Sequence, residues 1–265
     1  MRFIVESNWK MNLTQRDVAS FVRTLREAEA RFTAAIEFVL CASYTLLPRL
    51  AEESRGSACI SPGAQNVHGE ERGAFTGEIS AAQLVDAGAR YCVVGHSERR
   101  RDFGETDELV NRKVHAALNN GISPIVCIGE DLETRCAGRT EPAIGLQMER
   151  CLRGLSVSEI SRAVILYEPV WSVGNGQNAT PEQAGEAHRL IRSLLRARFP
   201  RDAADAARII YGGSVTPESA PDLLGIPDID GLGMGKASLD VNRFLQVAEL
   251  CAQRVAARPL RPLTE

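Results

Sequence analysis

Short apolar, often β-branched runs alternate along this chain with longer amphipathic segments. The short runs predict eight strands, and the longer segments repeat apolar residues at helical spacing. Strands are expected near residues 3–7, 37–41, 58–62, 91–94, 124–128, 164–167, 208–211 and 231–232. The clearest helical patterns cover residues 16–31, 107–119, 181–199 and 241–255. Strands that alternate with helices predict a parallel sheet with helical crossovers.

Eight evenly spaced strands fit either a closed barrel or an open, doubly wound sheet. An open sheet that binds a dinucleotide carries the glycine pattern GxGxxG directly after its first strand. Here the first strand runs instead into Asn8-Trp9-Lys10-Met11-Asn12. We therefore predict an α/β fold with a single (β/α)8 barrel domain over residues 1–256. Residues 257–265, which include Pro259 and Pro262, are expected to form a short C-terminal tail.

The charge composition narrows the range of partners. The 265 residues include 31 Lys and Arg against 34 Asp and Glu, for a net charge of −3, and like charges do not cluster. A dedicated nucleic-acid or membrane surface is therefore not expected, and an anionic ligand must be held by local groups. The chain shows neither a signal-peptide layout nor a membrane-spanning apolar run, and its seven cysteines lack CxxC spacing. These features predict a cytoplasmic protein with reduced thiols.

One carboxylate stands at the end of the sixth predicted strand. The apolar run before it delivers Glu168 to the strand terminus, Pro169 ends the strand, and a loop containing Gly174 and Gly176 follows. A carboxylate placed under a loop that opens and closes is suited to act as a general base.

Two further polar side chains follow predicted strands. Lys10 comes after the first strand, at the end where barrel active sites are built, and its ammonium can pair with a phosphate or a developing oxyanion. A surface lysine beside Trp9 is the alternative. His96 follows the fourth strand and precedes a possible helix start, which would keep its imidazole neutral and able to donate to a carbonyl oxygen. A structural histidine in an ion-pair cluster with Glu98 is the alternative there.

Glycine-rich turns follow the last two strands, at residues 212–215 and 231–238. Such turns let backbone N–H groups close on an anion near a helix start. Two ordinary tight turns at the rim of a barrel would have the same glycine-rich sequence. The second turn is not a P-loop, because that motif requires glycine where Asp230 stands. The other histidines, His68, His115 and His188, lack HxH or HExxH spacing, so no metal site is predicted.

Taken in order, the motifs NWKMN, GHSERR, YEPVW with its glycine loop, and YGGSV resemble the triosephosphate isomerase family. The stretches GAQNV, GAFTGEIS and CIGE agree, and the resemblance runs from about Phe3 to Val255. It implies a TIM barrel that interconverts dihydroxyacetone phosphate and D-glyceraldehyde 3-phosphate, in glycolysis and gluconeogenesis, without a metal or an organic cofactor.

The resemblance also implies catalytic roles. Glu168 is expected to be the base that moves a proton between the two carbons beside the carbonyl. Neutral His96 is expected to polarise that carbonyl and stabilise the enediolate. Lys10 would offset negative charge on the substrate, while Asn8 and Glu98 order this side of the site.

The same resemblance implies roles for further residues in substrate binding, in the lid and in the dimer. The substrate and its phosphate are expected to contact Gly174, Ser214, Leu232, Gly235 and Lys236. The mobile lid matches residues 169–179 and includes Pro169, Val170, Trp171, Gly176 and Ala179. The loop at residues 65–80, which begins at Gln65, resembles a segment that inserts into a partner subunit, with Thr76 reaching the partner's active site. A homodimer is therefore implied.

Three stretches depart from the family pattern, and one of them, Cys41-Ala42-Ser43-Tyr44 in place of a proline pair, is expected to be structural. The other two bear on the substrate. Lys236 replaces the second of two adjacent glycines, where a Cβ restricts positive φ but an ammonium adds a cation for the phosphate. The lid reads Asn175-Gly176-Gln177, where the family commonly has Thr-Gly-Lys. Both leave open a paralogue that acts on another small sugar phosphate, such as a tetrulose phosphate. An inactive, phosphate-binding barrel would have lost Glu168, His96 or Lys10, and all three are present.

Overall fold

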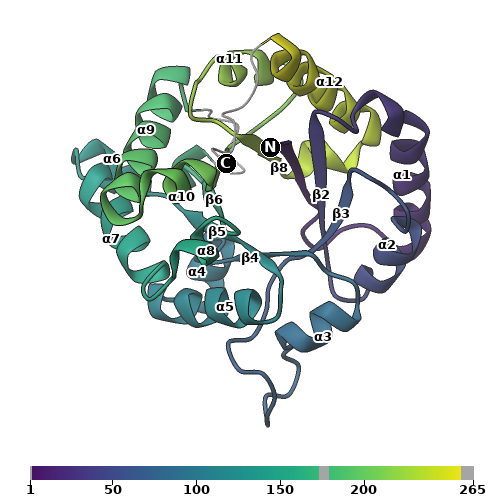
Figure 1. Ribbon diagram of the computed structural model, residues 1–265, viewed down its shortest axis with the longest axis horizontal. Helices are drawn as coiled ribbons and strands as arrows, with labels where there is room; N and C mark the ends of the chain where they lie inside the picture. The colour runs from purple at the N-terminus through teal and green to yellow at the C-terminus, as the bar shows by residue number, and fades with distance from the viewer. Residues whose placement is uncertain (1, 173–178, 258–265) are drawn as a thin grey trace.

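The computed structural model describes residues 2–172 and 179–257. Within them, eight strands pair in parallel with their neighbours in the chain, and β1 pairs with β8 to close a barrel. Figure 1 shows the strands in the middle of the molecule and the helices around them. The strands are β1 (Phe3–Asn8), β2 (Ile36–Ala42), β3 (Ile60–Ala64), β4 (Tyr91–Val94), β5 (Ser123–Ile128), β6 (Val164–Tyr167), β7 (Arg208–Tyr211) and β8 (Gly231–Met234). The predicted single-domain (β/α)8 barrel is confirmed.

The helices follow the predicted alternation with the strands. They are α1 (Gln15–Ala28), α2 (Leu47–Glu53), α3 (Ala81–Asp86), α4 (Ser97–Phe103), α5 (Asp107–Asn119), α6 (Leu132–Cys136), α7 (Thr140–Cys151), α8 (Val157–Ile160), α9 (Pro181–Arg198), α10 (Arg201–Ala206), α11 (Ala220–Leu224) and α12 (Val241–Ala257). Short 3-10 turns are η1 (Glu29–Arg31), η2 (Val170–Ser172) and η3 (Lys236–Leu239). None of the described helices has the length and apolar character needed to cross a membrane. Residues 258–265 of the expected tail lie outside the described residues.

The third strand begins two residues later than the apolar pattern predicts. The Glu29 carboxylate accepts hydrogen bonds from the N–H groups of Ala58, at 2.5 Å, and Cys59, at 3.3 Å. The Ser57 hydroxyl accepts another from the N–H of Ile60, at 3.0 Å. Because side chains already satisfy these amides, the regular ladder with β2 starts at Ile60.

Successive strand residues point alternately into the barrel and outward to the helices. The inward apolar residues form a compact inner core of Ile4, Val39, Cys41, Tyr91, Val93, Ile125, Cys127, Val164, Leu166 and Ile210. A larger apolar cluster fills the layer between the strands and the surrounding helices. Because all eight strands are parallel, their carboxyl ends meet at one rim of the barrel, where active sites of this fold are built.

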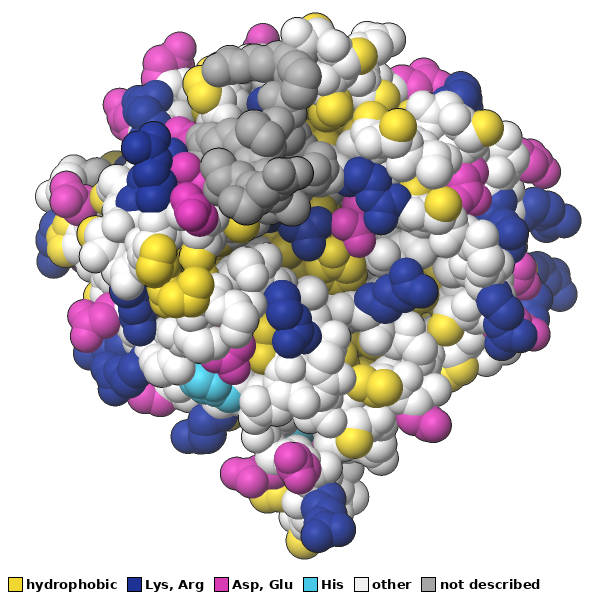
Figure 2. All heavy atoms as spheres, in the orientation of Figure 1, with side chains coloured by type: hydrophobic (Ala, Val, Ile, Leu, Met, Phe, Trp, Pro, Cys, Tyr) yellow, Lys and Arg dark blue, Asp and Glu magenta, His cyan; other side chains and the backbone are white. Residues whose placement is uncertain are grey.

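Charged side chains close the opposite end of the barrel. Arg208 on β7 pairs with Glu37 on β2 at 2.8 Å, and the Glu37 carboxylate also accepts hydrogen bonds from Tyr91 and Ser61. Although burial alone would raise it, Arg208 and these hydrogen bonds hold the pKa of Glu37 below its ordinary value. On the outer surface, Figure 2 shows acidic and basic side chains intermixed, without a large patch of one sign on that face.

A buried ion pair fastens helix α9 to the base of β8. Arg192 on α9 is 1% exposed, and its Nη2 lies 2.6 Å from Oδ2 of Asp230. Its Nη1 donates to the carbonyl oxygens of Ala204 and Ala207. The same Asp230 oxygen accepts the N–H of Ile209 at the start of β7. One guanidinium therefore joins α9, α10 and two strands.

We expect Arg192→Met to lower the free energy of unfolding by about 3–5 kcal/mol, because the buried Asp230 carboxylate would lose its ion pair with Arg192. Urea unfolding followed by circular dichroism measures the change. The matched control is Arg196→Met on the same helix, where the pair with Asp205 is partly exposed and contributes at most about 1 kcal/mol. Equal losses in the two variants would contradict the prediction.

Candidate active site

A cavity of about 630 Å³ opens at the carboxyl-end rim of the barrel. It is lined by residues within β1, β6 and β8 and in the loops that follow β1, β4, β6, β7 and β8, and thus joins segments that are far apart in the sequence. The predicted site residues among its lining are Asn8, Lys10, His96, Glu168, Ser214, Gly235 and Lys236. Glu98 stands beside it and contacts both Lys10 and His96. Leu232 is fully buried in the outer apolar cluster and does not line the cavity.

Glu168 follows β6 directly and is 2% exposed. Its carboxylate accepts two hydrogen bonds from Ser97, one from the N–H at 2.9 Å and one from the hydroxyl at 2.7 Å. The backbone of Glu168 lies so close to β5 that a Cβ on Gly129 would sit 1.8 Å from its carbonyl oxygen. The glycine of the CIGE motif is therefore what allows Glu168 to hold this position.

His96 is the N-cap residue of α4. Its Nδ1 accepts a hydrogen bond from the N–H of Glu98 at 3.2 Å, and its Nε2 lies 3.1 Å from Oε1 of Glu168. Because Nδ1 is occupied as an acceptor, the proton of the neutral ring belongs on Nε2, which faces Glu168. The ring thus presents an N–H donor to the cavity.

Lys10 adopts a backbone conformation that side chains rarely take, with φ of 50°. Its N–H donates to the Asn8 side chain at 3.0 Å, and its carbonyl oxygen accepts from the Gln65 amide at 2.9 Å. Its ammonium pairs with Glu98. Backbone strain held by several partners is typical of a residue that must stand at a fixed place in a functional site.

The glycine turn after β7 is shaped by close packing. A Cβ on Gly212 would lie 2.2 Å from the Leu166 side chain, and one on Gly213 would lie 2.3 Å from the Tyr211 hydroxyl. Lys236, by contrast, does not need glycine's freedom: among the described residues, positive φ at non-glycine positions occurs at Lys10 and Leu13. The lysine is thus accommodated at the cavity edge without backbone strain.

The start of the predicted lid is anchored to Glu130. Trp171, in η2, donates from its indole N–H to the Glu130 carboxylate at 3.3 Å, and the Tyr167 hydroxyl donates to it at 3.1 Å. Arg135 pairs with the same carboxylate at 3.0 Å and stacks over the Trp171 ring. Pro169 and Val170 belong to this anchored segment, and Ala179 is buried at the far end of the lid. Gly174 and Gly176 lie outside the described residues.

The sequence alone did not predict a role for Ser97, Glu130 or Glu6. Ser97 lies inside a recognised motif, but its contact with Glu168 depends on how β4 and β6 are placed on either side of β5. Glu6 lines the cavity from an inward position of β1, between Ile4 and Asn8. A carboxylate at an inward position of a buried strand was the available signal, because charged residues are rarely buried without a partner. Among the described residues, no cluster of His, Cys, Asp and Glu is arranged to hold a metal ion.

The family model described as triosephosphate isomerase matches residues 3–251. This chain belongs to the triosephosphate isomerase family. It is 44% identical over 248 residues to the triosephosphate isomerase of Acetivibrio thermocellus, covering 94% of this chain and 98% of the relative. It is 45% identical over 246 residues to that of Endomicrobium trichonymphae, covering 93% and 97%. The resemblance inferred from the motifs is confirmed.

A solved structure gives the same answer for the fold. The crystal structure of triosephosphate isomerase from Bartonella henselae superposes with a TM-score of 0.83 at 34% sequence identity. The match covers 94% of this chain and 99% of that one. Sequence and architecture therefore point to the same family over nearly the whole chain.

We expect the two interior-facing histidines to be opposite tautomers. His188 is fully buried, and its Nδ1 lies 3.1 Å from the carbonyl oxygen of Asp228, so its proton belongs on Nδ1. Burial lowers the pKa of His188 to about 4, so it is uncharged at neutral pH. His96 should instead carry its proton on Nε2. Nitrogen-15 NMR of the ring atoms, assigned with His96→Gln and His188→Gln, measures both; an Nδ1-protonated His96 would refute the assignment.

Proposed function

We propose that this chain interconverts dihydroxyacetone phosphate and D-glyceraldehyde 3-phosphate through an enediolate. The observation that carries the proposal is the meeting of a carboxylate, an imidazole N–H and an ammonium around one cavity that ends in two glycine turns. The carboxylate belongs to Glu168, the N–H to His96 and the ammonium to Lys10. Membership of the triosephosphate isomerase family supports the same reaction.

Each group has one part in the proton transfer. Glu168 removes a proton from the hydroxyl-bearing carbon beside the substrate carbonyl and returns it to the former carbonyl carbon, while the hydroxyl proton passes to the former carbonyl oxygen. His96 donates its Nε2 proton as a hydrogen bond to the oxygen that becomes negative, and Lys10 stabilises the same charge. A preorganised donor of this kind lowers the barrier by about 3–4 kcal/mol, and general base action adds roughly 10²–10⁴-fold.

The catalytic carboxylate must move before it can act. In this structure Glu168 is held by two hydrogen bonds from Ser97 and is almost completely buried. We infer that substrate binding draws the carboxylate from Ser97 into the cavity. Closure of the lid at residues 169–179, with its first segment anchored on Glu130, would then exclude water from the enediolate.

The phosphate group is proposed to lie between the two glycine turns. Backbone N–H groups near Ser214 and Gly235 would hold its oxygens, as anions are held at helix starts. Lys236 lines the same part of the cavity and is exposed, so its ammonium is available to the phosphate. Gly174 is proposed to join from the lid, and no metal or organic cofactor has a part in this scheme.

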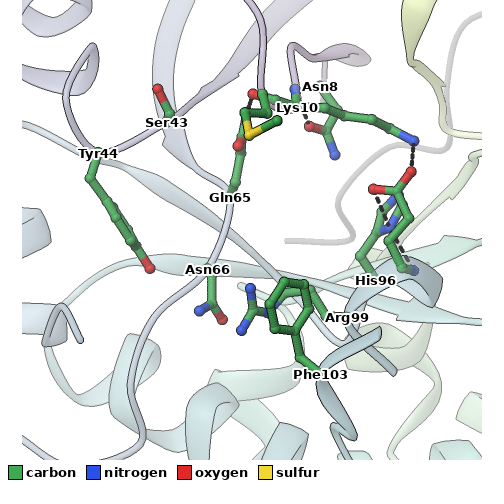
Figure 3. Close-up of a pocket in the computed structure, with 11 residues that line it drawn as sticks. Asn8, Lys10, Ser43, Tyr44, Gln65, Asn66, His96, Arg99 and Phe103 are labelled. Carbon is green, nitrogen blue, oxygen red and sulfur yellow. Dashed lines mark hydrogen bonds and ion pairs between the residues drawn. The ribbon is translucent and has the colours of Figure 1, made fainter. Parts of the chain in front are cut away.

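We also propose that the chain acts as a homodimer, in the cytoplasm. The loop between β3 and α3 projects well away from the barrel (Figure 1). A second cavity of about 260 Å³ lies beside the catalytic residues and is walled by Tyr44, Gln65 and Phe103 (Figure 3). Met11 and Phe103 at this cavity are 96% and 68% exposed, which is unusual for large apolar side chains grouped together.

The proposed occupant of this surface is a second copy of the chain. The projecting loop of one subunit would enter the smaller cavity of the other and place Thr76 next to Lys10. Because this contact would support the strained backbone at Lys10, assembly and activity should depend on each other. All seven cysteines are unpaired, which supports a reducing compartment.

Glu168→Gln is expected to lower kcat for isomerisation of glyceraldehyde 3-phosphate by about 10²–10⁴-fold, because the amide cannot accept the proton. A coupled assay of initial rates measures the effect, with Glu149→Gln, an exposed carboxylate on α7, as the matched control. A four-carbon ketose phosphate is assayed beside the triose. A preference for that substrate would keep the mechanism and change the substrate, while an inactive wild type would refute the function.

Phe103→Asp is expected to convert the dimer to monomers and to reduce kcat at least tenfold, since a carboxylate at the interface centre is costly to bury. Sedimentation velocity and the same rate assay test the two effects together. Leu146→Asp is the control, because Leu146 is another exposed large apolar side chain, 45% exposed on α7 and away from this cavity. An active monomer of Phe103→Asp would contradict the coupling.

A further inference from the structure

Glu6 occupies a place that few carboxylates tolerate. It lies on β1 with its side chain inside the barrel, is 2% exposed, and lines the same cavity as Lys10 and Glu168. Two residues before Asn8 in the strand, it sits deeper than the rim residues. Its Oε1 is buried without a hydrogen-bond partner among the described residues.

The neighbouring strand β8 leaves space for the Glu6 side chain. Glu6 stands opposite Gly233 in the ladder between β1 and β8. A Cβ on Gly233 would lie 2.9 Å from Oε2 of Glu6, so the carboxyl group fills the space that a side chain there would take. The glycine and the carboxyl group are therefore complementary parts of the cavity floor.

The groups that face Glu6 leave its charge uncompensated. From β2 and β5 come the thiols of Cys41 and Cys127, and burial raises the pKa of each far above its ordinary value, so both are neutral. Lys10 beyond the end of β1 is engaged by Glu98, and Glu168 beyond β6 is of like charge. Burial raises the pKa of Glu6 to about 8; the Cys41 thiol and Lys10 oppose this rise, and Glu168 adds to it.

We propose that Glu6 is a positioning residue for the isomerisation: as an uncharged carboxylic acid beneath the substrate it lets the Glu168 carboxylate enter the cavity, and once ionised it opposes that entry. The inference rests on the proposed function. Like charges in a buried, low-dielectric space repel strongly, and the substrate phosphate adds further negative charge. Glu6 acts through Glu168 and does not exchange protons with the substrate.

Ionisation of Glu6 should therefore reduce turnover at alkaline pH. For the wild type, kcat/KM should fall above about pH 8, approaching tenfold per pH unit as a single group ionises. In Glu6→Gln, which keeps the shape and removes the charge, this fall should be absent when each profile is normalised to its own value near neutrality. Glu6→Met, an uncharged side chain of similar length, should give the same flattened profile.

The matched control is Glu37→Gln. Glu37 is also an inward carboxylate of the barrel, but it lies at the opposite end and is paired with Arg208. Its variant should retain the alkaline fall of the wild type. A wild-type alkaline limb that persists unchanged in both Glu6→Gln and Glu6→Met would overturn the inference.

A second measurement does not depend on activity. Since the pKa of Glu6 is higher in the folded state than in the unfolded chain, the unfolded state ionises first as pH rises, and the wild type loses stability across about pH 4.5 to 8. The difference in melting temperature between Glu6→Gln and the wild type should therefore widen over that interval and level off above it. A constant difference would also overturn the inference. If the wild type isomerises nothing at any pH, the proposed function fails, and the melting series still decides whether Glu6 is neutral.

Discussion

Closure of the parallel ladder between β1 and β8 is the constraint on which the rest of the molecule depends. In a closed parallel barrel every strand ends at the same rim, so residues separated by most of the chain become neighbours. Lys10, His96 and Glu168 follow three different strands and meet there without any local sequence relation. Closure also removes exposed strand edges, which leaves the rim loops free to carry chemistry.

Within the closed barrel, the pKa of a glutamate depends on which neighbours surround it. The side chains of Glu37 and Glu6 both point into the barrel, and both are buried. Glu37 gains Arg208 and hydrogen bonds, and its pKa lies below the ordinary value. Glu6 gains no such cation, and its pKa lies well above it. The site end of the barrel therefore holds a neutral acid where the opposite end holds an ion pair, which keeps negative charge low where an anionic substrate would bind.

The proposed catalytic groups are held by short-range contacts that the motifs themselves supply. His96 receives the N–H of Glu98 from its own motif, and Lys10 is held by Asn8 from its own. The contacts between motifs are of a different kind: Ser97 holds Glu168, and Glu98 holds Lys10, across separate strands. These cross-strand contacts hold Glu168 and Lys10 in the arrangement from which, in the proposed reaction, substrate binding releases Glu168.

Sequence alone determined the alternation of strands and helices, because hydrophobic periodicity is a local property, and it determined the motifs that identify the family. It also placed Glu168, His96 and Lys10 at strand ends. The tertiary structure decided what periodicity cannot encode: that Gly129 must lack a Cβ to let Glu168 approach, that Lys236 needs no positive φ, and that Oε1 of Glu6 is buried without a hydrogen-bond partner among the described residues. Burial, hydrogen-bond partners and pKa arise from neighbours brought together across the barrel, so they exist only once the chain has closed.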